Sequence, residues 1–171
     1  LLTKAKAQRL VPTLTCTSSN VVRSVLQAFA QLPDLTLFFG PDTYMGGNLR
    51  TMFERYAELD DAAIAALHPA HNQASIRRVL TGLRTFEQGT CVVHHLFGAD
   101  VVARVKQHYA DAFVCAHLEV PGEMFGLAAG LVPTGQGVVG STSNILAFIN
   151  EKLAESATGG GDASLLTFVL G

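Results

Sequence analysis

Short, unbroken apolar runs alternate with amphipathic stretches along most of this chain, and that alternation limits the fold more than any other feature. The runs LTLFFGP (35–41) and DAFVCAHL (111–118) have the length of strands and offer apolar side chains to both faces of a sheet. The stretches VVRSVLQAFAQL (21–32) and ADVVARVKQHYA (99–110) repeat apolar residues at the helical period. Strands buried on both faces and separated by helices predict an α/β fold of three-layer α/β/α, Rossmann-like domains with parallel sheets.

The same reasoning assigns the rest of the chain. We expect strands within 10–20, 90–97, 135–140 and 165–170, and helices over 48–59, 72–88, 123–131 and 141–157, with a partly helical connector at 60–71. We place a domain boundary near residue 90, which gives domains at 1–90 and 91–171. Because the chain opens at Leu1 rather than Met, we expect it to be a piece of a longer protein.

Charge and composition exclude two classes of partner. The net charge is -2 and no basic block carries interleaved aromatic residues, which argues against binding nucleic acid. The longest mostly apolar stretch, 111–133, is interrupted by ionisable residues and predicts no membrane span. With 49% apolar and only 15% charged residues, the chain has enough apolar material for a buried core.

The 3 cysteines, Cys16, Cys91 and Cys115, are odd in number and widely spaced. That pattern argues against a disulfide framework or a zinc finger and favours a reducing compartment. Cys16 and Cys115 fall inside apolar runs and are expected in the core, whereas a functional role for Cys91 is open. We interpret three histidines in polar helical contexts as solvated: His68, His71 and His108.

Polar loops follow the predicted strands, at the carboxyl ends where α/β sheets bind ligands. These loops read CTSSN, GPDTYMGGN, CVVHH, HLEVPGE and GSTSN. The hydroxyls of CTSSN and GSTSN can hold a carboxylate or phosphate beside a helix N-terminus, and simple helix capping is the alternative. Asp42 in GPDTYMGGN favours a turn with a capping side chain over a catalytic role.

His117 and Glu119 are the most informative pair. Residues two apart on a strand share a face, so both side chains point to one side just before a Pro-Gly turn. Burying the two ionisable groups costs free energy unless they are paired with each other or with a ligand. From the residues alone, a structural His–Glu hydrogen bond and a pair of catalytic groups are both open.

Taken in order, the blocks TCTSSNVV, GPDTYMGGNL, GTCVVHHLFG, HLEVPGEM and VGSTSNILAFI resemble those of the quinolinate synthase family over nearly the whole chain. The sequences CTSSNVVRSVLQAFAQLPDLTLFFGPDTYMGGN and HLFGADVV are most similar to those of the plant and algal branch, whose members reside in plastids. The resemblance implies α/β domains within a three-domain, pseudo-symmetric enzyme. One departure is HLE, where many bacterial members have His-Pro-Glu.

The resemblance implies a condensation of iminoaspartate with dihydroxyacetone phosphate to quinolinate, a step of NAD biosynthesis. Family members hold a 4Fe–4S cluster through three cysteines, and its open iron acts as a Lewis acid. Cys91 falls on the middle cluster ligand. The other two ligands are expected outside this chain, so the chain alone is expected to be inactive. The resemblance gives roles in substrate binding to Ser18, His94, His117, Ser141 and Thr142, and in catalysis to His117 and Glu119.

The partners that the resemblance implies are the two small substrates, L-aspartate oxidase as a metabolic partner and a second copy in a homodimer. The implied location is the plastid, with the cytoplasm as the alternative. Two other interpretations stay open. One is a non-catalytic α/β ligand-binding domain, and the other is a Rossmann-like sugar-nucleotide enzyme, suggested by GST and the glycine-rich turns.

Overall fold

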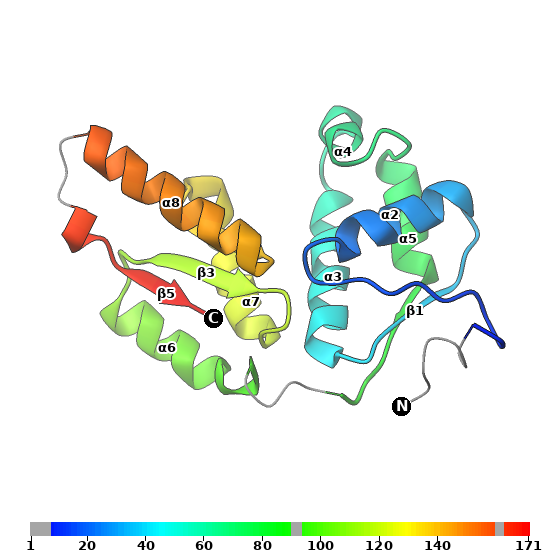
Figure 1. Ribbon diagram of the computed structural model, residues 1–171, viewed down its shortest axis with the longest axis horizontal. Coiled ribbons are helices and arrows are strands. Elements are labelled where there is room, and N and C mark those ends of the chain that lie inside the picture. Colours follow the sequence, from blue (N-terminus) through cyan, green and yellow to red (C-terminus); the bar gives the residue numbers. More distant parts are fainter. Residues whose placement is uncertain (1–7, 90–93, 160–162) are drawn as a thin grey trace.

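The computed structural model describes residues 8–89, 94–159 and 163–171. Two groups of helices and strands lie side by side, the first formed by residues before position 90 and the second by residues after it (Figure 1). Each group contains a parallel sheet with helices packed against it. The predicted α/β class, with Rossmann-like layers around parallel sheets, is therefore confirmed.

Helices and strands alternate along the chain, as the apolar runs predict. No helix in the described ranges is both long enough and apolar enough to cross a membrane. In chain order the elements are α2 (Val21–Gln31), β1 (Leu37–Phe39), α3 (Thr43–Tyr56), α4 (Asp61–Leu67), α5 (Gln73–Gly82), β2 (Leu83–Thr85), η1 (His94–Leu96), α6 (Ala99–His108), β3 (Phe113–His117), α7 (Gly122–Leu131), η2 (Val132–Thr134), β4 (Gly137–Gly140), α8 (Thr142–Thr158), η3 (Ala163–Leu165) and β5 (Phe168–Leu170).

The first sheet pairs β1 with β2 in parallel, with Leu37 opposite Leu83. Helices α2 and α3 both pack against α5 and enclose an apolar core. Helix α3 buries positions 45, 48, 49, 52 and 53, which follow the helical spacing of three and four residues. The fully buried side chains of this core include Leu26, Leu49, Phe53, Ile64, Ile76, Val79 and Leu83.

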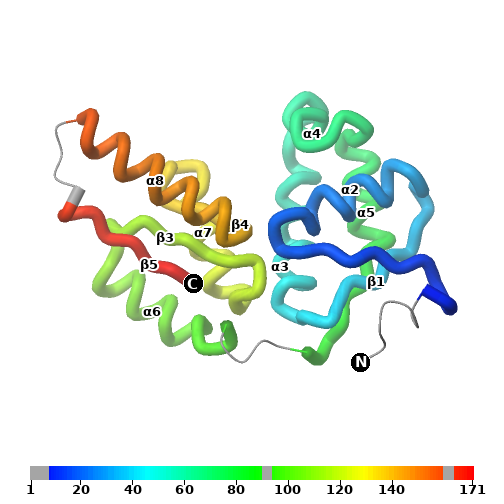
Figure 2. Tube along the Cα trace, in the orientation of Figure 1, coloured from blue at the N-terminus to red at the C-terminus, as the bar shows by residue number. Residues whose placement is uncertain are grey.

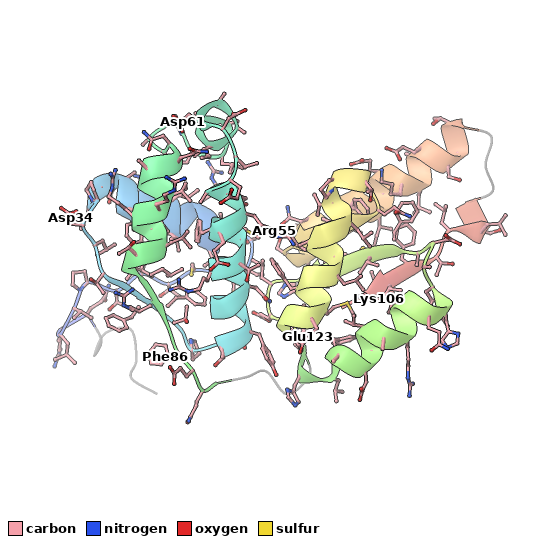
Figure 3. All side chains as sticks on the ribbon, turned by 180° about the vertical axis from the view of Figure 1, so that it is seen from behind. Asp34, Arg55, Asp61, Phe86, Lys106 and Glu123 are labelled. Atoms are coloured by element: carbon pink, nitrogen blue, oxygen red, sulfur yellow. The ribbon has the colours of Figure 1, made fainter. Side chains whose placement is uncertain are left out.

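The second sheet has the order β4-β3-β5, and all of its strands are parallel. Helices α7 and α8 lie on opposite faces of this sheet, and α6 packs beside α7 (Figures 1 and 3). The central strand β3 buries Val114, Cys115 and Ala116, as expected of a strand covered on both faces. The tube in Figure 2 shows that the carboxyl ends of β3 and β5 point toward the first group of elements.

Helix α3 belongs to the first group of elements and contacts the second group. The Arg55 guanidinium donates to the carbonyl oxygen of Ala129 in α7 at 2.7 Å, and Figure 3 shows Arg55 between these two helices. Asn48, about two turns earlier on α3, donates to carbonyls that follow β3. The helix therefore lies next to the carboxyl edge of the second sheet. A domain boundary near residue 90 remains a prediction.

The strand predicted within 10–20 is wrong. These residues form turns and irregular chain, and Leu10, Val11 and Leu14 are largely exposed. Apolar residues alone do not make a strand where no neighbouring strand supplies hydrogen-bond partners, and no described strand pairs with this segment. The strand predicted over 90–97 is also wrong for its described part, which forms the 3₁₀ turn η1.

The helix predicted over 72–88 ends at Gly82, and the chain continues as β2. A Cβ atom at position 82 would lie 2.3 Å from the carbonyl oxygen of Leu35, so this close approach of two backbones requires glycine. Pairing with β1 and complete burial of Leu83 outweigh the helical propensity of the residues that follow.

The interpretation of His71 as solvated is wrong, whereas His108 is exposed as predicted. His71 is only 5% exposed, and its ring lies between α2 and α5. Its Nε2 lies 2.8 Å from the carbonyl oxygen of Leu26 and its Nδ1 lies 2.9 Å from Ser75 Oγ. Both ring nitrogens thus have partners, which is why the side chain can be buried.

Candidate functional site

The carboxyl ends of β3 and β4 meet at one edge of the second sheet because the strands are parallel. His117 ends β3 opposite Gly140, which ends β4. The N–H of His117 donates to Gly171 at 2.9 Å, and the N–H of Leu118 donates to Gly140 at 3.2 Å. These bonds continue the ladder past the strand ends. They fix the backbone immediately before Glu119.

His94, His117 and Glu119 bring three potential ligand atoms together at this edge, and we call these residues the His–Glu cluster. One Glu119 carboxylate oxygen lies 3.4 Å from His94 Nδ1 and 3.7 Å from His117 Nδ1. The two imidazole rings stack with centroids 5.4 Å apart and planes 7° from parallel. The three ligand atoms lie within 4.8 Å of one another, and the described residues contain no second group of this kind.

Two buried ring nitrogens of the His–Glu cluster have no hydrogen-bond partner among the described residues. They are the Nδ1 atoms of His94 and His117. Burial lowers the pKa of His117, the charge of Glu119 opposes this effect, and the neighbouring His94 adds to it. Imidazole nitrogens and a carboxylate that converge in this way can be satisfied by a cation or by a polar ligand. The geometry does not show the structural His–Glu hydrogen bond that the sequence left open.

A cavity of about 190 Å³ lies between the two groups of elements and reaches the same sheet edge. Ser18 and Ser19 line it from the first group, while Gly140 and Asn144 of the GSTSN loop line it from the second. Leu118, between the two ionisable residues of HLE, is also in its wall. Three of the predicted loops therefore meet around one cavity.

Two of the candidate polar residues are helix caps. The Ser141 hydroxyl accepts from the N–H of Asn144 at 3.4 Å and donates to its side-chain oxygen at 2.6 Å, in a capping box at the start of α8. Asp42 accepts from the N–H of Met45 at 2.7 Å, which confirms the predicted cap. Thr142 follows Ser141 and is exposed in the first turn of α8.

Cys91 lies outside the described residues. Cys115 is fully buried in β3, as predicted, and burial raises the pKa of its thiol to about 11. Cys16 is half-buried, packs against the core, and has a thiol pKa that burial also raises. Neither of the described cysteines belongs to the His–Glu cluster.

The thiol of Cys115 is expected to resist alkylation. With a pKa of about 11, roughly one thiol in a thousand is ionised at pH 8. Iodoacetamide should therefore label Cys115 at least ~100-fold more slowly in the folded protein than in the urea-unfolded protein, as measured by peptide mass spectrometry. Equal rates in the two samples would show that this thiol is neither buried nor inert.

Three residues near the site have no role in the sequence-based prediction: Arg23, Tyr44 and Asn48. Arg23 lines the cavity. Tyr44 contacts His95, the neighbour of His94. Asn48 carried a detectable signal, because it falls on the buried face of α3 with Met45, Leu49 and Met52. A polar side chain on an apolar helix face must find buried partners, and the sequence does not show which ones.

Comparisons with a family profile and with individual proteins point to the same family. The profile of the family described as "Quinolinate synthetase A protein" matches residues 2–167. The whole chain is 54% identical to "Quinolinate synthase, chloroplastic" of Nicotiana tabacum, 54% identical to the protein of that name from Arabidopsis thaliana and 52% identical to that from Oryza sativa subsp. japonica. It covers 23% of the tobacco protein and 24% of the other two, about a quarter of their length. No solved structure gives a significant match. The chain belongs to the quinolinate synthetase A family.

Proposed function

We propose that the protein containing this chain is a quinolinate synthase of NAD biosynthesis. It would condense iminoaspartate with dihydroxyacetone phosphate and release phosphate and water. Family membership supports the reaction. The observation that carries the residue assignment is the His–Glu cluster, in which two buried imidazole nitrogens without a hydrogen-bond partner converge on a carboxylate. The chain spans about a quarter of its relatives, so other segments would supply the rest of the site.

The His–Glu cluster has the chemistry expected of residues that face the open iron of an iron–sulfur cluster. Neither of the described cysteines, Cys16 or Cys115, has the properties of a thiolate ligand to such a cluster. Iron–sulfur clusters are held by cysteine thiolates, whereas the pKa values of Cys16 and Cys115 are both raised. Imidazole and carboxylate are ligands that iron accepts at an open coordination position. From the family resemblance we assign Cys91 as the one ligand from this chain to a 4Fe–4S cluster, with two cysteines from outside it. When bound, the cluster supplies a Lewis-acidic iron.

We propose separate roles for the residues at the sheet edge in substrate binding, iron ligation and proton transfer. His117 is kept neutral by burial and offers a ring N–H to a substrate carboxylate. Glu119 would ligate the open iron or carry protons at its carboxylate oxygen, and His94 lies beside it. The hydroxyl of Ser18, in the cavity wall, and that of Thr142, exposed in the first turn of α8, would bind carboxylate or phosphate oxygens, and Ser141 would orient Thr142 by capping α8.

The test is an anaerobic assay of the complete protein. Purified protein with its 4Fe–4S absorbance should convert iminoaspartate and dihydroxyacetone phosphate to quinolinate, detected by liquid chromatography. Omission of either substrate is the control. Protein that has a normal cluster and forms no quinolinate would contradict the proposal and leave a non-catalytic ligand-binding role. Tight binding of a sugar nucleotide, with no response to oxygen, would favour the sugar-nucleotide hypothesis.

We also propose that the complete protein resides in the plastid. The support is that its relatives from tobacco, Arabidopsis and rice are named as chloroplastic. A fluorescent fusion of the complete protein should co-localise with chlorophyll fluorescence, whereas a diffuse cytoplasmic signal would contradict this location.

A further inference from the structure

Helix α3 presents two polar side chains, Tyr44 and Asn48, to the second group of elements. They are four residues apart and so lie on the same face of the helix. The helix packs against α7, next to the carboxyl edge of the second sheet (Figure 1). Each side chain contacts backbone or side-chain atoms beside a member of the His–Glu cluster, and neither is a member itself.

Asn48 holds the backbone on both sides of Glu119. Its side chain is 3% exposed, and its amide nitrogen donates to the carbonyl oxygen of Leu118 at 3.0 Å and to that of Val120 at 2.7 Å. Both N–H groups of the amide are thus used on the residues that flank Glu119. One buried group therefore fixes the turn from which the carboxylate projects.

Tyr44 holds the other side of the cluster. Its hydroxyl is hydrogen-bonded to His95 Nδ1, and the two rings stack with centroids 6.0 Å apart and planes 12° from parallel. His95 directly follows His94, whose Nδ1 lies 3.4 Å from the Glu119 carboxylate. Holding His95 therefore restrains the turn that carries His94.

We propose that Tyr44 and Asn48 are positioning residues that set the distance between Glu119 and His94. One face of α3 would fix both turns of the His–Glu cluster at once, although the helix belongs to the first group of elements. In this account the tyrosine and the buried asparagine of GPDTYMGGN position the cluster, while its aspartate caps α3. The catalytic consequence of the positioning rests on the proposed function, whereas the geometric consequence does not.

The experiment compares three variants of the complete protein. Asn48→Asp replaces two donated hydrogen bonds with a carboxylate facing two carbonyl oxygens. Tyr44→Phe keeps the stacked ring and removes only the hydroxyl, so it tests the proposal even if Asn48→Asp does not fold. Arg55→Met is the matched control, because it removes a hydrogen bond from the same helix to α7, away from the cluster.

Crystal structures of the variants give a readout independent of activity. In Asn48→Asp and Tyr44→Phe the distance from Glu119 to His94 Nδ1 should increase beyond the ~4 Å of an ion pair, and in Arg55→Met it should not. For quinolinate formation, we expect kcat to fall on the order of 10- to 100-fold in Asn48→Asp and about fivefold in Tyr44→Phe. KM and the iron–sulfur absorbance should stay near the wild-type values. Arg55→Met should lower Tm without lowering kcat.

The outcomes separate the two proposals. Unchanged distances within the His–Glu cluster in both variants would overturn the positioning role, whatever the activity. If the distances increase while wild-type protein with a normal cluster makes no quinolinate, the positioning role stands and the proposed reaction fails. A fall of kcat in Arg55→Met equal to that in Asn48→Asp would show that general docking of α3, rather than positioning, controls the rate.

Discussion

Replacing Glu119 with Gln in the complete protein is expected to lower kcat for quinolinate formation at least ~100-fold, the usual scale for a group that transfers protons. Glutamine has nearly the same shape, and its buried neighbours Leu118 and Val120 should keep their places. The amide cannot carry the negative charge or accept a proton in the way the carboxylate does. The iron–sulfur absorbance should therefore be retained while turnover is lost, and both can be measured on one anaerobic sample.

Glu123→Gln is the matched control for this substitution. Glu123 lies four residues further along, in the first turn of α7, where its side chain is exposed. The chemical change is the same, but this carboxylate does not belong to the His–Glu cluster. We expect normal turnover in Glu123→Gln. Near-normal turnover in Glu119→Gln would show instead that Glu119 has only a structural role.

The local spacing of apolar residues predicted the helices that bury one face and the strands that are buried on both faces. The stripe in VVRSVLQAFAQL became α2, and the continuous run DAFVCAHL became the central strand β3. The convergence of strand-end loops also followed from pattern alone, because parallel strands bring their carboxyl ends to one edge. Ser18, Leu118 and Gly140 accordingly line a single cavity.

The sequence could not show which elements pair across long distances. Residues 83–85 follow a helical pattern, and only the partner β1 makes them a strand. His71 lies in a polar context along the chain, yet its partners are 45 and 4 residues away. Asn48 finds its partners 70 and 72 residues away, on both sides of Glu119. Polar side chains on buried faces signal that such partners exist, but only the packing of α3 against the second sheet identifies them.

Replacing Cys91 with Ser in the complete protein is expected to abolish the 4Fe–4S absorbance and, with it, quinolinate formation. Iron–sulfur clusters depend on thiolates, and a serine hydroxyl neither ionises near neutral pH nor offers a soft sulfur ligand. Cys91 is also only three positions before His94, whose Nδ1 lies beside Glu119. The visible absorbance of the iron–sulfur cluster in the anaerobically purified protein is the measurement.

Cys115→Ala separates loss of a ligand from loss of any cysteine. Cys115 is buried in β3 with a thiol pKa of about 11, so alanine removes an inert apolar group, and a normal iron–sulfur absorbance is expected. The two variants together test the assignment of ligands within the chain. A normal cluster in Cys91→Ser would mean that this chain gives no thiolate to it. Loss of the cluster in Cys115→Ala at unchanged Tm would move the ligand from Cys91 to Cys115, which the burial and the raised pKa of that thiol argue against.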